Sequence, residues 1–376
     1  MDKENGSLAE VIKVFFRLGL TAFGGPAAHI AMMEKELVEE KKWIDHQHFL
    51  DLIGATNLIP GPNSTEMTMH CGRERAGIPG LFAAGAAFIF PSALLTGILA
   101  WAYVTYGELP QVIPFMAGIA PVVLAIMSRA IWKLGKKATG RRWQKYLLVI
   151  VLAAALQGAN EILLLIGTGL LAFIIAWIAH HRKQGPEKAG AILLLGLTSP
   201  GSLSGMAIFW KFLKVGSILY GSGYVLFAYL VPELVETGHM TRTALLDAIA
   251  MGQFTPGPVL TTATFIGYNL GGWTGAVAAT LGIFLPSFLF VLLLNPLIPK
   301  MRSWPPLSTF LDAVNVAAVA VMTAVLIEMG LEALQEWQSI CVALLGGLMT
   351  FGRPQWHSMW TVFAGALLSF ILFSFF

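Results

Sequence analysis

Long apolar runs recur along this chain from about residue 10 to its last residues, and they constrain the fold more than any other feature. Several approach the roughly 20 residues that a helix needs to cross the hydrocarbon core of a bilayer. Strands of a membrane barrel would alternate apolar and polar side chains, whereas residues 147–155 are apolar throughout. The charged fraction, 12%, is about half that of an ordinary soluble domain. The sequence therefore predicts an all-α polytopic membrane protein.

Polar and turn-rich stretches divide the apolar runs into two series of candidate helices. We expect about 10 to 12 hydrophobic helices in total. A stretch rich in Gly, Pro and Ser, residues 185–204, is predicted to connect an N-terminal repeat (1–184) to a C-terminal repeat (205–376). The candidate helices lie near 9–33, 46–70, 78–106, 110–134, 145–158 and 161–180, and then near 205–234, 242–269, 273–299, 307–331, 335–350 and 356–376.

The two series share an ordered set of motifs. Pro60-Gly61-Pro62 recurs as Pro256-Gly257-Pro258, a shift of 196 residues, and Pro91-Ser92 recurs as Pro286-Ser287, a shift of 195. Matches that keep their order over such a length are typical of a duplication. We therefore predict two homologous halves.

The distribution of basic residues predicts the relative orientation of these halves. The loop after the fourth helix of the first series, residues 133–145, holds six Lys and Arg residues, whereas its counterpart around Glu336 holds none. Conversely, Lys300 and Arg302 follow the third helix of the second series, and the matching loop, 107–111, has no basic residue. Because basic loops stay in the cytoplasm, this reversal indicates an inverted-topology repeat. Secondary transporters use this arrangement, with a site where the repeats meet.

The Pro-Gly-Pro triplets are the strongest local signal for a site. Each proline removes a backbone donor and clashes with the preceding turn, so the helix must break there. The freed amides and the helix N-terminus after the break can hold an anion, although a structural kink is the alternative. An amide side chain lies about one turn upstream of each triplet, and hydroxyls follow. The candidate substrate-binding residues are Asn57, Pro60, Gly61, Pro62, Asn63, Ser64, Thr65, Gln253, Pro256, Gly257, Pro258, Thr261 and Thr262.

The first helix of each half also carries a basic residue before a small-residue pair. Arg17 precedes Gly24 and Gly25, and Lys214 precedes Gly221 and Ser222. Charged residues inside spans usually face protein or water, so we add these six residues to the candidate substrate-binding set. Snorkelling of the two cations to the lipid headgroups is the alternative.

Glu66 follows the first break, and Thr262 occupies the corresponding position in the second half. A buried carboxyl group can carry a proton, which makes Glu66 the candidate for proton coupling. A structural bond to Arg73 or Arg75 is the alternative. Arg129, in the fourth helix, is interpreted either as part of an anion path or as a snorkelling residue.

Other functional classes are disfavoured. The net charge of +3 is small and dispersed, so no nucleic-acid partner is expected. There is no phosphate-binding glycine loop, no clustered set of metal ligands and no nucleophile with a base, so we expect neither an enzyme nor a cofactor. A lipid-modifying enzyme within the membrane remains an alternative of a different class, and a homodimer is left open.

In these motifs the chain resembles the chromate ion transporter (CHR) family. The resemblance covers almost the whole chain and matches the long, two-domain form of that family. It implies a multi-pass protein of the prokaryotic inner membrane that exports chromate by proton-coupled antiport and confers chromate resistance. Sulfate is the chemical analogue, and a transporter or channel for another anion is the alternative. The motifs that carry the resemblance are Phe23-Gly24-Gly25-Pro26, Phe49-Leu50-Asp51 through Asn57 to Pro62, 77–80, 221–223, 253–258 and 264–267.

Overall fold

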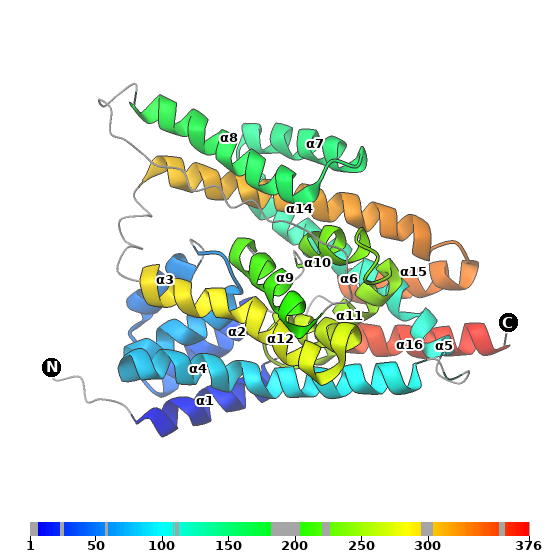
Figure 1. The fold of residues 1–376 in the computed structure, drawn as a ribbon, viewed down its shortest axis with the longest axis horizontal. Helices are drawn as coiled ribbons and strands as arrows, with labels where there is room; N and C mark the ends of the chain where they lie inside the picture. The colour runs from blue at the N-terminus through cyan, green and yellow to red at the C-terminus, as the bar shows by residue number, and fades with distance from the viewer. Residues whose placement is uncertain are drawn as a thin grey trace.

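The computed structural model describes residues 7–22, 26–56, 59–107, 109, 113–181, 204–219, 226–294, 304–352 and 358–375. These residues form helices and no strands, which confirms the all-α prediction for this part of the chain (Figure 1). The predicted connector falls almost entirely outside them. The first half contains α1 (Leu8–Thr21), α2 (Pro26–Met33), the π-helix η1 (Glu34–Glu40), α3 (His46–Thr56), α4 (Asn63–Tyr106), α5 (Ile113–Ala117), α6 (Ile119–Ala138), α7 (Arg142–Leu156) and α8 (Glu161–His181).

The second half follows the same order. It contains α9 (Gly205–Ile218), α10 (Leu226–Leu230), the π-helix η3 (Val231–Val235), α11 (Arg242–Phe254), the short 3-10 helix η4 (Val259–Thr261), α12 (Thr262–Leu294), α14 (Pro305–Ala333), α15 (Trp337–Gly352) and α16 (Ser358–Phe375).

Several helices begin at a side-chain cap. At the start of α11, the Thr241 hydroxyl accepts a hydrogen bond of 3.1 Å from the amide of Ala244. Before α3, a carboxylate oxygen of Asp45 accepts a hydrogen bond of 2.9 Å from the amide of His48. That bond holds the pKa of Asp45 below its usual range, since it favours the ionised carboxyl. Such caps satisfy amides that have no partner within the first turn of a helix.

Both α4 and α12 fold back on themselves at a glycine. Gly77 has φ 63° and ψ −154°, and Gly272 has φ 58° and ψ −151°, a backbone conformation that glycine adopts without strain. The arms before and after each turn pack backbone to backbone. A Cβ added to Gly72 would lie 2.4 Å from the carbonyl oxygen of Gly80, and one added to Gly267 would lie 2.3 Å from that of Gly275. Each helix is therefore a tight hairpin, with its turn near the predicted helix boundary.

The second arms of α4 and α12 pack against each other in opposite directions. Phe82 stacks on Phe288 with ring centroids 5.5 Å apart, and a Cβ added to Gly97 would lie 2.8 Å from the Trp273 ring. The contacts thus advance along α4 while they retreat along α12. Since α4 and α12 are equivalent in the repeat, the two halves are inverted relative to each other, as the basic loops predict.

The halves interlock through their later helices. In the first half α6 packs against α15 of the second half, and α14 of the second half packs against α7 and α8 of the first. The early helices stay within their own half, with α1 on α4 and α9 on α12. These contacts are close, because a Cβ on Gly19 would lie 2.6 Å from the Phe88 carbonyl oxygen and one on Gly216 would lie 2.4 Å from that of Ile283.

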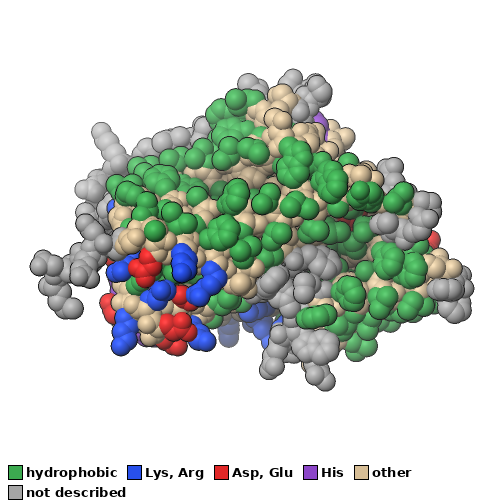
Figure 2. All heavy atoms as spheres, turned by 90° about the horizontal axis from the view of Figure 1, so that it is seen from below, with side chains coloured by type: hydrophobic (Ala, Val, Ile, Leu, Met, Phe, Trp, Pro, Cys, Tyr) green, Lys and Arg blue, Asp and Glu red, His purple; other side chains and the backbone are tan. Residues whose placement is uncertain are grey.

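The outer surface is suited to lipid. Four helical stretches in the described residues are long and apolar enough to cross a membrane, 63–106, 113–136, 259–293 and 305–331. Apolar side chains cover most of the face in Figure 2, while charged side chains gather toward one end. Outward-facing leucines such as Leu163, Leu331 and Leu348 are more than 70% exposed. Transfer of each such side chain from water to lipid is favourable by about 1.5–3 kcal/mol. This chain is therefore a multi-pass membrane protein.

Candidate functional site

The two Pro-Gly-Pro breaks meet the opposite half of the protein. The Gly61 amide donates a hydrogen bond of 2.7 Å to the carbonyl oxygen of Leu219, the residue that follows α9. Reciprocally, the Gly257 amide donates a hydrogen bond of 2.8 Å to the carbonyl oxygen of Ala22, the residue that follows α1. Each break is thus completed by the end of the first helix of the other half. The predicted helix breaks are present, and they lie where the halves meet.

At the second break, four buried hydroxyls hydrogen-bond one another. The Thr261 hydroxyl lies 2.9 Å from that of Ser92, and the Thr96 hydroxyl lies 3.2 Å from Thr255 and 3.3 Å from Thr261. Ser92 and Thr96 belong to α4, so this cluster joins the two halves. Thr262, the counterpart of Glu66, donates to the carbonyl oxygen of Val259 at 2.8 Å.

The first break has a different composition at the equivalent place. Thr65 and Ser287 correspond to Thr261 and Ser92, and Glu66 is added beside them. A Cβ on Gly61 would lie 2.1 Å from a carboxylate oxygen of Glu66 and 2.4 Å from the Ser287 hydroxyl, so both groups face Gly61. The position accepts only glycine, because Gly61 also has φ 139°.

The polar atoms of this first break have few hydrogen-bond partners. The Ser287 hydroxyl lies beside the Glu66 carboxyl, while the Thr65 hydroxyl has no partner among the described residues, and all three side chains are buried. One turn further along α4, both ring nitrogens of His70 are in the same situation. A buried polar atom without a partner costs about 1–3 kcal/mol. Because this polar cluster is present at only one of the two equivalent positions, the first break is the candidate site.

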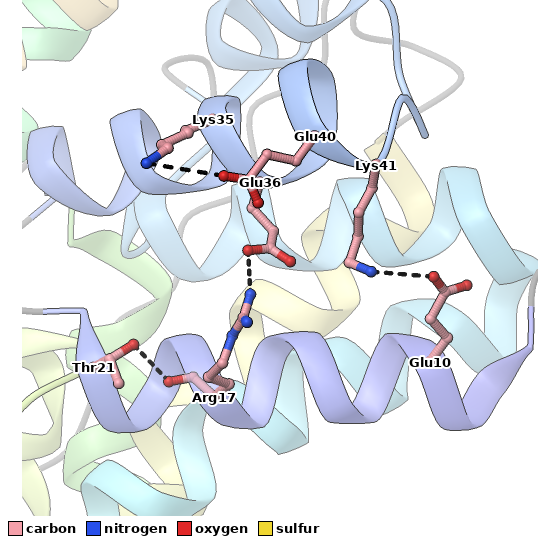
Figure 3. A network of polar contacts seen from close by, with 7 residues as sticks. All are labelled: Glu10, Arg17, Thr21, Lys35, Glu36, Glu40 and Lys41. Atoms are coloured by element: carbon pink, nitrogen blue, oxygen red, sulfur yellow. Dashed lines mark hydrogen bonds and ion pairs between the residues drawn. The ribbon is translucent and has the colours of Figure 1, made fainter.

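The basic residues of the first helices are engaged in ion pairs within their own halves. Arg17 pairs with Glu36 of η1, as the network in Figure 3 shows. Lys214 pairs with the equivalent acid, Glu233 of η3, at 2.5 Å, and Lys211 lies 3.6 Å from the same carboxylate. Both carboxylates are nearly buried, so the pairs tie the first helix to the π-helix that follows it. Their positive charges are balanced before any anion arrives.

The alternative partners considered for Glu66 bind elsewhere. Arg73 donates to the carbonyl oxygens of Val291 and Leu292, at 3.4 and 3.3 Å, and thereby links the hairpin turn of α4 to the end of α12. Arg75 pairs with Glu10 at 3.1 Å. The structural bond that the sequence left open for Glu66 is therefore not formed with either arginine.

The remaining candidate residues are placed as follows. Asn63 begins α4 and is half-buried, and Ser64 is buried and accepts a hydrogen bond from Thr68 through its carbonyl oxygen. Gln253 lies in the last turn of α11, directly before the second break, but its side chain is outside the described set. Gly24, Gly25, Asn57, Gly221 and Ser222 also lie outside the described residues.

Sequence reasoning missed four members of the site. Ser92 and Ser287 were visible only as part of a repeated Pro-Ser pair, and nothing in the sequence indicated that each reaches the break of the other half. Thr96 and Thr255 have no counterparts in the repeat, since Val291 and Ile59 occupy those positions. Their role depends on the packing of α4 on α12, which a single sequence does not reveal.

Two inverted helical halves that meet at paired broken helices are the architecture of a secondary transporter. A family model described as chromate transporter matches residues 9–174 and again 206–370, so this chain belongs to the chromate transporter family. It is 31% identical over 352 residues to a chromate transport protein of Cupriavidus metallidurans, covering 90% of this chain and 86% of that protein.

Other relatives are similar over most of their length. A probable chromate transport protein of Synechococcus elongatus is 29% identical over 350 residues, covering 90% of this chain and 88% of the relative. An uncharacterised transporter of Methanocaldococcus jannaschii is 26% identical over 377 residues, covering 94% and 92%. No solved structure matches the chain.

Proposed function

We propose that this protein is a secondary active transporter that exports chromate, or a closely related tetrahedral oxyanion such as sulfate, across the prokaryotic inner membrane and so confers chromate resistance. Membership of the chromate transporter family supports the class of substrate. The names of the relatives in Cupriavidus metallidurans and Synechococcus elongatus, both chromate transport proteins, support it further.

The observation that carries the proposal is the cluster of buried polar side chains at the first break. Thr65 lies in the first turn of α4, the helix that follows the triplet, and the positive end of that helix dipole faces the break. The Thr65 hydroxyl has no hydrogen-bond partner among the described residues, and the Glu66 carboxyl and the Ser287 hydroxyl meet beside Gly61, where only glycine leaves room for them. A tetrahedral dianion needs several converging donors, which hydroxyls, amides and a helix N-terminus supply without a fixed positive charge that would trap the ion.

We assign the second break, with Gln253 and the Thr261 hydroxyl, to the opposite wall of the same site. In this arrangement Asn57 and Gln253 would add one amide side chain from each half. The halves would then expose the site alternately to the two sides of the membrane by moving against each other at the α4–α12 contact. Arg17 and Lys214 contribute to the stability of the two first helices rather than to the anion, since each is paired with a carboxylate.

Proton coupling is assigned to Glu66. An ionised carboxylate beside the site repels a dianion, whereas a protonated one can donate a hydrogen bond to it. This favours symport, in which the proton and the dianion bind and cross together. The family resemblance implies antiport, in which one is exchanged for the other. One proton carried with a dianion leaves one net negative charge, which an inside-negative membrane potential drives outward.

The test is radiolabelled chromate flux in proteoliposomes with an imposed membrane potential and pH gradient. Loss of one hydrogen bond to a charged ligand costs about 1.5–3 kcal/mol, so we expect Ser287→Ala to raise the half-saturating chromate concentration roughly 10- to 100-fold. Ser217→Ala is the matched control, because the Ser217 hydroxyl donates to the Leu213 carbonyl oxygen of its own helix.

The same assay tests the role of Glu66. Wild-type flux should fall as the pH rises through the titration of Glu66, and Glu66→Gln, which is permanently neutral, should lose that pH dependence. Glu39→Gln, at an exposed acid of η1, is the control. Unchanged pH dependence in Glu66→Gln would remove the coupling role, while absence of chromate flux in a folded wild-type sample would remove chromate as substrate. Stimulation by an oppositely directed proton gradient would identify exchange.

Sulfate and molybdate serve as competitors in the flux assay. If the half-inhibitory concentration of either anion is lower than the half-saturating concentration of chromate, that anion becomes the assigned substrate.

A further inference from the structure

A basic hollow lies on the outside of the protein, at the end of a spanning helix and away from the breaks. It is formed by Arg129, Trp132, Lys133 and Lys136 of α6 together with Phe351 of α15. The residues of α6 recur every three or four positions, so they share one face of the helix. Its volume is about 520 Å³, which is enough for a lipid headgroup and the glycerol that follows it.

The lining residues combine positive charge with exposed aromatic rings. Trp132 is 62% exposed and Phe351 is 52% exposed, so neither ring is used in the core. The Lys136 ammonium lies 4.9 Å from the centroid of the Trp132 ring, a contact that holds both side chains over the hollow. Among the described residues, the lining holds three cationic side chains and no carboxylate.

The position along α6 places this hollow at headgroup depth. The apolar part of the helix, 113–136, is long enough to cross a bilayer, and the lining residues occupy its last two turns. Beyond them, Arg141 starts a short basic segment and pairs with Asp312 of α14 at 3.5 Å. Tryptophan side chains are favoured at the level of the headgroups, and basic pockets between spanning helices bind anionic headgroups.

We propose that this hollow is a binding site for an anionic phospholipid. The phosphate diester would be held by Arg129, Lys133 and Lys136, with Trp132 and Phe351 against the glycerol and the upper acyl chains. The two exposed rings favour a lipid over a free anion, because a soluble anion gains no binding energy from apolar contact. A purely snorkelling role for the cations would not need Phe351, which comes from a different helix.

The site lies on a contact between the two halves. In the interior of the same helix pair, a Cβ on Gly346 of α15 would lie 3.3 Å from the Ala125 side chain of α6. A lipid bound across α6 and α15 therefore bridges elements that belong to opposite halves. Occupancy should raise the thermal stability of the full protein.

The experiment measures lipid binding to the purified full-length chain by native mass spectrometry and by the shift of the thermal unfolding midpoint. Dioleoylphosphatidylglycerol, dioleoylphosphatidylcholine and inorganic phosphate are titrated separately. Each basic residue near a membrane contributes about fivefold to the affinity for an anionic lipid, so Arg129→Gln/Lys133→Gln should bind phosphatidylglycerol roughly 20-fold more weakly than wild type. Phe351→Ala should also weaken it.

The control variant is Arg142→Gln/Lys145→Gln, which removes the same charge from the basic segment that follows the hollow. It should bind phosphatidylglycerol within about twofold of wild type, since its side chains do not line the site. Equal weakening in the control and in Arg129→Gln/Lys133→Gln would overturn the proposal in favour of general attraction to an anionic surface. Equal binding of the two lipids would overturn it as well, and stabilisation by phosphate alone would reassign the hollow to a soluble anion.

Discussion

Gly257 offers a direct test of how tightly the two halves close around the second break. Its φ is 86°, and a Cβ there would lie 2.8 Å from the Ser92 Cβ and 3.0 Å from the Gly19 carbonyl oxygen, both in the other half. Gly158 provides a matched control, because its φ of 82° is nearly the same while a Cβ would meet nothing within 4 Å. Alanine at either position carries the cost of a left-handed backbone, about 1–2 kcal/mol.

Only Gly257→Ala adds the cost of forcing α1 and α4 away from the break. Overpacking of a dense interior typically costs about 1–3 kcal/mol, which gives a total of roughly 2–5 kcal/mol for Gly257→Ala against 1–2 for Gly158→Ala. The assay is thermal unfolding in detergent, followed by tryptophan fluorescence, with chromate flux as a second readout. We expect a clearly lower midpoint and lost flux for Gly257→Ala, and near-normal flux for Gly158→Ala. Equal midpoints for the two variants would refute the close contact between the halves.

Three further substitutions test contacts away from the first break, each by thermal unfolding. Ser92→Ala removes the hydroxyl that Thr261 contacts across the halves, and we expect a loss of about 1–2 kcal/mol. Tyr103→Phe removes the hydroxyl that donates to Asp247 at 2.6 Å. The free energy of unfolding should fall by roughly 1.5–3 kcal/mol, because the carboxylate is buried and its other oxygen has no partner among the described residues. Thr241→Ala removes the cap of α11 and should cost about 1 kcal/mol; no change would mean that water or the backbone replaces the cap.

The sequence was sufficient to predict the architecture. Hydrophobic length gave the spanning helices, proline and glycine gave the breaks, and the reversed distribution of basic residues gave the inversion that α4 and α12 show. These signals are local or compositional, so they can be recognised in a single sequence. The π-helices η1 and η3 were not foreseen, and neither was the pairing of Glu36 and Glu233 within them with Arg17 and Lys214 of the first helix of each half.

The site was only partly predictable for a related reason. Thr65, Glu66 and Thr261 lie next to a triplet in sequence, so a motif search finds them. Ser92 and Ser287 reach the triplets only because the halves cross. Each serine is far in sequence from the triplet that it contacts, so a motif search does not find the contact. The ion pairs of Arg17 and Lys214 were likewise invisible, because the acids that engage them are 19 residues away on another helix.

The hydrogen bond from Gly61 to Leu219 also sets an order of events during synthesis. About 160 residues separate donor from acceptor, which a ribosome adds in roughly 10 to 30 s. For that interval the first Pro-Gly-Pro segment is already made but its closing carbonyl does not exist. The nascent first half must therefore wait in an unfinished state, with the Gly61 amide bonded to water or held by the insertion machinery, until α9 arrives.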